Sequence, residues 1–115
     1  MPRSRYGEDG ADMIQYDIML ENAVKAVAQI AYDEASRVCP VRTGRLKRSI
    51  SKRVFNERPT GRITATVGTD VPYAPSVEFG GYHRRPKPFL ETGLEAARQS
   101  VPLVFSMTFG GGFGG

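Results

Sequence analysis

The sequence predicts an α+β fold with a long N-terminal helix, an antiparallel sheet built on a β-hairpin, and a C-terminal helix packed on the sheet. Three observations carry this prediction. Apolar residues recur at helical spacing before Pro40, alternate with polar residues over 62–68, and return to helical spacing after Pro88. A chain of 115 residues is the usual size of a single domain. We expect that domain over residues 13–105.

The N-terminal helix is expected over Ile14–Val38, where no glycine or proline interrupts the pattern. Pro40 should end it, because the residue before a proline is disfavoured in the α region. Residues 1–12 are polar and contain glycine, so they are predicted to form a flexible arm. The apolar stripe of the helix comprises Leu20, Ala23, Val24, Val27, Ile30, Ala31, Ala35 and Val38.

A short helical turn and a hairpin are expected next. Thr43 is a plausible N-cap for a turn in GRLKRSI. The strands are expected in SISKRVF and RITATVG, joined by NERPTG. In the second strand Ile63, Ala65 and Val67 alternate with polar residues, as in a half-buried strand.

The last third of the chain is predicted to be a loop followed by a helix. One helical turn is expected at Pro75–Phe79, and Pro88 is well placed as the first residue of the final helix. Gly93 weakens this helix, and Pro102 should kink or end it. Residues 106–115 form a Gly-rich tail, in which Phe109 and Phe113 are candidate anchors for an apolar pocket on an adjacent subunit.

Charge is distributed unevenly, although the net charge is only +4. Counting Lys and Arg against Asp and Glu, residues 1–36 carry −4, residues 37–62 carry +8, and the remainder is neutral. Such a basic block can face DNA, a neighbouring subunit or only solvent. The candidate DNA-channel or subunit-facing residues are Arg42, Arg45, Lys47, Arg48, Lys52 and Arg53.

The sequence offers little for catalysis or metal binding. Cys39 is the only cysteine, so no internal disulfide and no multi-cysteine metal site can form. A triad would depend on the sole histidine, His83, and a nuclease would need more clustered carboxylates than Glu78 and Glu91 provide. We therefore expect no enzymatic activity and no cofactor. No apolar run approaches the length of a membrane span, and no secretory signal is expected.

Three segments stand out in order: CPVRTGRLKRSI, VGTDVPYAPSVEFGG and RPKPFLETGLEAA. Together they resemble the tail-component family of HK-type lambdoid phages, the neck or tail-completion proteins, over about residues 20–100. Gly81 stands where the family pattern usually has threonine, and the final SMTFGGGFGG lies outside that pattern. The residues that carry the resemblance are Pro40, Thr43, Gly44, Leu46, Ser49, Val67, Gly68, Thr69, Tyr73, Ala74, Val77, Glu78, Phe79, Gly80, Pro88, Phe89 and Leu90.

The resemblance also suggests roles for individual residues. Thr43 and Gly44 would cap and turn the chain from the long helix into the sheet. Glu78 would pair with a nearby arginine or meet the next subunit. Phe89 would be buried at the start of the last helix. Gly44 and Gly80 stand where the chain must turn sharply, so we expect a positive φ there.

At the level of function, the resemblance implies a structural virion protein that forms a ring of six or twelve copies at the head–tail junction. Its partners would be other neck, connector, tail-terminator or tail-tube proteins, and DNA that passes non-specifically through the conduit. It would sit in the neck or at the top of the tail, after assembly in the host bacterial cytoplasm, with no membrane contact. The alternative is a basic DNA-binding module.

Overall fold

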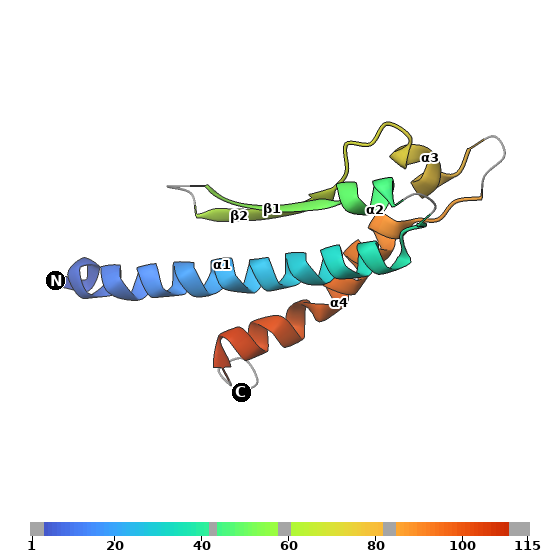
Figure 1. Ribbon diagram of the computed structural model, residues 1–115. Coiled ribbons are helices and arrows are strands. Elements are labelled where there is room, and N and C mark those ends of the chain that lie inside the picture. The colour runs from blue at the N-terminus through green and yellow to red at the C-terminus, as the bar shows by residue number, and fades with distance from the viewer. Residues whose placement is uncertain (1–3, 42–43, 58–60, 82–84, 111–115) are drawn as a thin grey trace.

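The computed structural model describes residues 4–41, 44–57, 61–81 and 85–110. The long helix α1 forms the axis of the molecule, with the hairpin and α4 on different sides of it (Figure 1). This mixture of helices and one antiparallel hairpin confirms the predicted α+β class. In chain order the elements are α1 (Ser4–Val38), α2 (Arg45–Ser49), β1 (Ser51–Glu57), β2 (Arg62–Gly68), α3 (Ala74–Phe79) and α4 (Phe89–Thr108).

Helix α1 ends at Val38, as Pro40 predicts, but begins at Ser4 rather than at Ile14. It therefore includes most of the residues that the sequence assigned to a flexible arm. Its N-terminal part extends beyond the hairpin and α4 (Figure 1). Apolar periodicity reports the buried face of a helix, so it gives no signal where a helix continues past the elements it packs against.

Strands β1 and β2 pair antiparallel, with Lys52 opposite Val67 and Asn56 opposite Ile63. One face of the hairpin packs on α1, where the Lys52 ammonium lies 5.5 Å from the centre of the Tyr32 ring. On the same face Asn56 Nδ2 donates a hydrogen bond of 2.8 Å to a carboxylate oxygen of α1. The opposite face is open, and Phe55 on it is 48% exposed.

Helix α4 packs mainly against α1, whereas the sequence predicted that it would pack on the sheet. The reason lies at Gly93: a Cβ there would be 2.5 Å from the carbonyl oxygen of Ala31 and 3.0 Å from Cβ of Ala35. Small residues on both helices thus permit a close crossing. The sequence interpretation treated Gly93 only as a weak point of the helix.

The bounds of α3 and α4 lie close to those predicted. Helix α3 spans the expected turn, and α4 begins one residue after Pro88. Pro102 does not end α4, which continues to Thr108 and so includes the start of the predicted tail. Proline has no N–H for the bond to the carbonyl four residues earlier, but the following turns remain helical.

The main core lies where α1 ends and α4 begins. Its largest fully buried side chain is that of Phe89, which is 1% exposed. Burial of Phe89 at the start of the last helix confirms the prediction for this residue. The buried members of the cluster are Ala35, Cys39, Leu46, Ile50, Val71, Ala74, Val77 and Phe89.

Candidate functional site

The three sequence segments meet around this core. Ser49, at the end of α2, hydrogen-bonds through Oγ to Oγ1 of Thr69 at 2.5 Å. The same Thr69 oxygen accepts the backbone N–H of Val71 at 3.1 Å. Ser49 Oγ also lies 2.6 Å from the carbonyl oxygen of Leu46, to which it donates. A serine of the first segment and a threonine of the second therefore fix the junction between α2 and the end of β2.

Glu78 joins the second segment to the third. Its side chain is only 7% exposed. The carboxylate accepts backbone N–H groups from Leu90 at 2.9 Å and from Glu91 at 3.0 Å. These amides belong to the first turn of α4, where helices have unpaired N–H groups and a partial positive charge. Glu78 is therefore a helix cap supplied from α3, a role that differs from the two left open by the sequence, an arginine partner or a contact with the next subunit.

Two glycines of the segments adopt the expected positive φ. Gly44, which precedes α2, has φ 81° and ψ −7°. Gly80, which ends α3, has φ 85° and ψ 158°, a combination open almost only to glycine. Gly44 takes the capping position expected for Thr43, which lies outside the described residues. The chain reversals on either side of the core thus depend on glycine.

The remaining segment residues divide into buried and exposed groups. Leu46, Ala74 and Phe89 are buried and have structural roles. Tyr73 is 37% exposed, and the guanidinium of Arg45 lies 5.6 Å from its ring centre. Phe79 is 77% exposed, so this aromatic residue remains available for a contact with another molecule.

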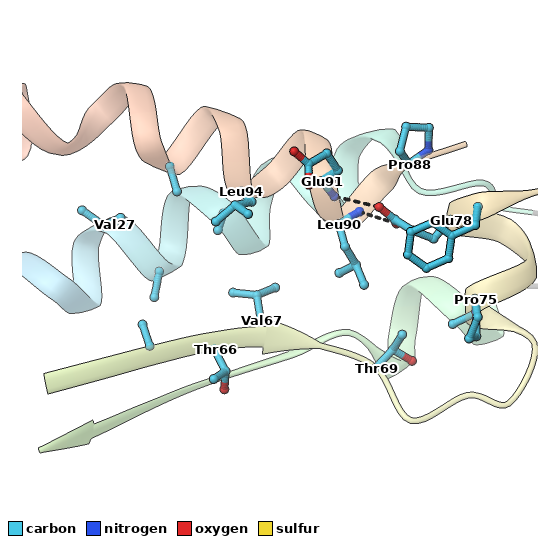
Figure 2. Close-up of a pocket in the computed structure, with 16 residues that line it drawn as sticks. Val27, Thr66, Val67, Thr69, Pro75, Glu78, Pro88, Leu90, Glu91 and Leu94 are labelled. Atoms are coloured by element: carbon cyan, nitrogen blue, oxygen red, sulfur yellow. Dashed lines mark hydrogen bonds between the residues drawn. The ribbon is translucent and has the colours of Figure 1, made fainter. Parts of the chain in front are cut away.

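Phe79 lines a groove of about 890 Å³. The groove lies between α1, β2, α3 and α4, and its lining is mostly apolar. Val67 of β2 and Leu90 of α4 point into the space, whereas Thr66 points to the other side of the sheet (Figure 2). Glu78 and its two hydrogen bonds to α4 close one end of the space (Figure 2). Sequence reasoning did not find this groove, because it depends on how α4 is placed relative to β2.

Comparison with known proteins decides the family. Residues 11–80 match the model of the family described as "Bacteriophage HK97-gp10, putative tail-component". The chain belongs to this family. The matched region is more than half of the chain and contains the first segment and all of the second except Gly81, while the segment around Phe89 lies beyond it. Neither a curated protein nor a solved structure matches the chain.

For a member of this phage tail-component family, the basic block is the other surface of interest. Arg45, Lys47 and Arg48 on α2 are exposed, as are Lys52 and Arg53 on β1. Arg42 lies outside the described residues. Arg37 lies in α1 and donates two hydrogen bonds to Glu34, which lower the pKa of that carboxyl. The basic surface is therefore concentrated on α2 and β1.

Among the described residues of this tail-component protein, few side chains are suited to metal binding or catalysis. No set of three or more His, Cys, Asp or Glu side chains among them is placed to hold a metal ion. Burial raises the pKa of the Cys39 thiol, which makes it a poor nucleophile. His83 is outside the described residues. None of the helices described is both long and apolar enough to cross a membrane.

Of the two candidate tail anchors, Phe109 and Phe113, the structure describes only Phe109. The rings of Phe105 and Phe109 have their centres 5.9 Å apart, so Phe109 packs on its own helix. Phe113 lies outside the described residues.

Membership of the family makes the protein a virion-associated structural component of a phage.

Proposed function

We propose that the protein forms a ring at the head–tail junction of a tailed phage, as a neck or tail-completion component that helps to form the DNA conduit. The observation that carries the proposal is the charge distribution of a phage tail-component protein. Residues 1–36 carry −4 and residues 37–62 carry +8 in the same chain. Opposite charges on one protomer favour head-to-tail contacts, which can close into rings.

The ring would contain six or twelve copies and contact connector, neck, tail-terminator or tail-tube proteins. It would assemble in the host cytoplasm and remain in the virion at the top of the tail. Its role is structural, with no catalysis and no cofactor. The exposed cations of α2 and β1 are the surface that would face either passing DNA or the acidic part of the next copy.

The test is a charge reversal on α2. Changing Arg45, Lys47 and Arg48 together to Glu should abolish ring assembly and particle formation while the monomer stays folded, as judged by circular dichroism. A matched control reverses Lys25, Arg37 and Arg98, each of which pairs with an acid on its own helix. Its net charge changes equally, yet we expect assembly to persist. A normal yield of particles from the α2 variant would contradict the proposal.

A DNA-binding module is the second candidate, because the same basic surface suits phosphates. Such a module binds duplex DNA in isolation, with an affinity that falls steeply as salt rises. A ring component instead binds weakly alone and copurifies with neck and tail proteins. Fluorescence anisotropy of the isolated protein on a labelled duplex, over a salt series, distinguishes the two functions.

A further inference from the structure

The hairpin has two free edges, since β1 and β2 pair only with each other among the described residues. In an antiparallel strand every second residue directs its backbone N–H and C=O away from its partner strand. Each free edge is thus a template for pairing with a further strand. β2 borders the apolar groove, with Ala65 and Val67 among the residues that line it.

The two edges differ in their protection against pairing. β1 carries Lys52 and Arg53, and such charges usually keep edge strands from pairing with each other. Apart from Arg62 at its start, β2 has no charged residue, and four of the five residues from Ile63 to Val67 are β-branched, which favours a strand. The free edge of β2 is therefore open to pairing with another strand. The edge of β1 would pair only with a strand beside acidic side chains, because of its own cations.

Helix α4 presents an uncovered apolar wall beside the edge of β2. Leu90 and Leu94 line the groove, and Leu94 is 49% exposed. Val101, seven residues further on, continues the same helix face and is 38% exposed. A third strand, about 4.8 Å beyond β2, would extend the sheet over the groove and bring a further hydrophobic surface against this wall.

The charges that line the groove indicate which strand would pair with the free edge of β2. The charged residues that line the groove, Glu78 and Glu91, are both acidic. They lie at the end of the groove near Thr69, the end at which β1 begins and carries Lys52 and Arg53. Rotation about an axis close to the strand direction leaves β1 of the next copy antiparallel to β2. That copy therefore brings its cations to the end where Glu91 stands.

We propose that, in the ring, β1 of each copy pairs with the free edge of β2 in the next, so that the hairpins form one continuous sheet and the groove is the subunit interface. The contact is heterologous, because unlike edges meet and two basic β1 edges repel each other. This inference rests on the proposed function, since it names the surfaces by which the ring closes.

The first test places a charge on the apolar wall. Leu94→Lys should weaken self-association by at least about tenfold in sedimentation experiments, because an unpaired ammonium is costly to bury. Leu94 is half exposed in the single chain, so its melting temperature should change little. Leu103→Lys is the matched control, since Leu103 is 64% exposed and lies on the opposite side of α4 from Leu94; it should assemble normally.

Hydrogen exchange in the wild-type protein provides a second test that needs no variant. On assembly, amide exchange in 51–57 and 62–68 should slow by about tenfold or more, because free edge groups become paired. If Leu94→Lys self-associates as strongly as wild type, or if rings form while exchange in both strands is unchanged, this interface is wrong and the proposed ring still stands. A wild-type protein that forms no ring, alone or with its tail partners, would overturn the proposed function as well.

Discussion

The Glu78 carboxylate accepts the backbone N–H of Leu90 at 2.9 Å, so a side chain of α3 holds the first turn of α4. The second carboxylate oxygen accepts the N–H of Glu91. Lys87 N–H in addition donates to the carbonyl oxygen of Val77 at 2.7 Å. The start of α4 is thereby fixed to α3 by three hydrogen bonds, and with it the wall of the groove.

Replacing Glu78 should destabilise the fold. Glu78→Ala leaves two helix N-terminal amides without their acceptor, and we expect a loss of about 2–3 kcal/mol. Glu78→Gln keeps one acceptor oxygen but loses the charge that favours a helix N-terminus, and should cost about 1–2 kcal/mol. Urea denaturation measures both. Glu91→Gln serves as the control, because Glu91 is an exposed acid in the first turn of α4. Its stability should stay within about 0.5 kcal/mol of wild type.

Sequence reasoning found the parts of this site but not how they interact. The family resemblance implied the burial of Phe89, and the sharp turn expected at Gly80 predicted its positive φ. The role of Glu78 was not predicted, because its amide partners lie twelve and thirteen residues away and backbone groups leave no trace in a sequence.

The placement of α4 was beyond sequence reasoning for a similar reason. Its apolar face predicts burial but does not name the element that covers it. Gly93 was the available clue, since a glycine inside a helix often marks a close approach of two backbones. The groove between α4 and β2 follows from that placement and was therefore missed.

Gly44 and Gly80, which both have a positive φ, should respond differently to substitution. Gly80→Ala forces a side chain into a backbone region almost closed to L-residues, and should cost about 1–3 kcal/mol. Gly44 lies in the left-handed α region, so Gly44→Ala should cost about 1 kcal/mol and Gly44→Asn less. A Cβ at Gly44 meets only the movable end of Arg48, so backbone strain dominates.

Chemical denaturation of the three variants ranks these costs. Gly68→Ala is the control, because a Cβ there contacts nothing within 4 Å and its φ is not positive. We expect the control to match wild type within about 0.5 kcal/mol. If Gly80→Ala were as stable as Gly68→Ala, the backbone conformation at Gly80 would not require glycine.

Gly93→Ala should separate the two long helices. Its Cβ would lie 2.5 Å from the carbonyl oxygen of Ala31, a backbone atom that cannot move aside alone. The helix propensity of alanine favours the variant by about 1 kcal/mol, but overpacking should cost more, for a net loss of about 1–3 kcal/mol. Ala96→Gly on the same helix is the informative comparison, since it loses propensity without creating a clash. A Gly93→Ala protein more stable than wild type would show that the crossing is loose.

Cys39 should react slowly with thiol reagents. It is 3% exposed, and burial disfavours the thiolate and so raises the pKa of the thiol. At pH 8 the reactive fraction is therefore smaller than for a free cysteine, and a reagent must wait for local or global unfolding. The rate with a colorimetric disulfide reagent should rise steeply across the urea transition, in step with unfolding measured by circular dichroism. Fast labelling in the absence of urea would contradict this burial.

The Gly-rich tail offers a test of anchoring by a neighbour. Phe113 is predicted to enter an apolar pocket on an adjacent subunit, and it lies outside the described residues. Truncation after Gly110 should leave the melting temperature of the monomer unchanged and reduce particle assembly. Phe109→Ala should instead lower the melting temperature slightly, because that ring packs on Phe105. A truncated monomer that melts earlier yet assembles normally would place the tail on its own helix and remove the interface role.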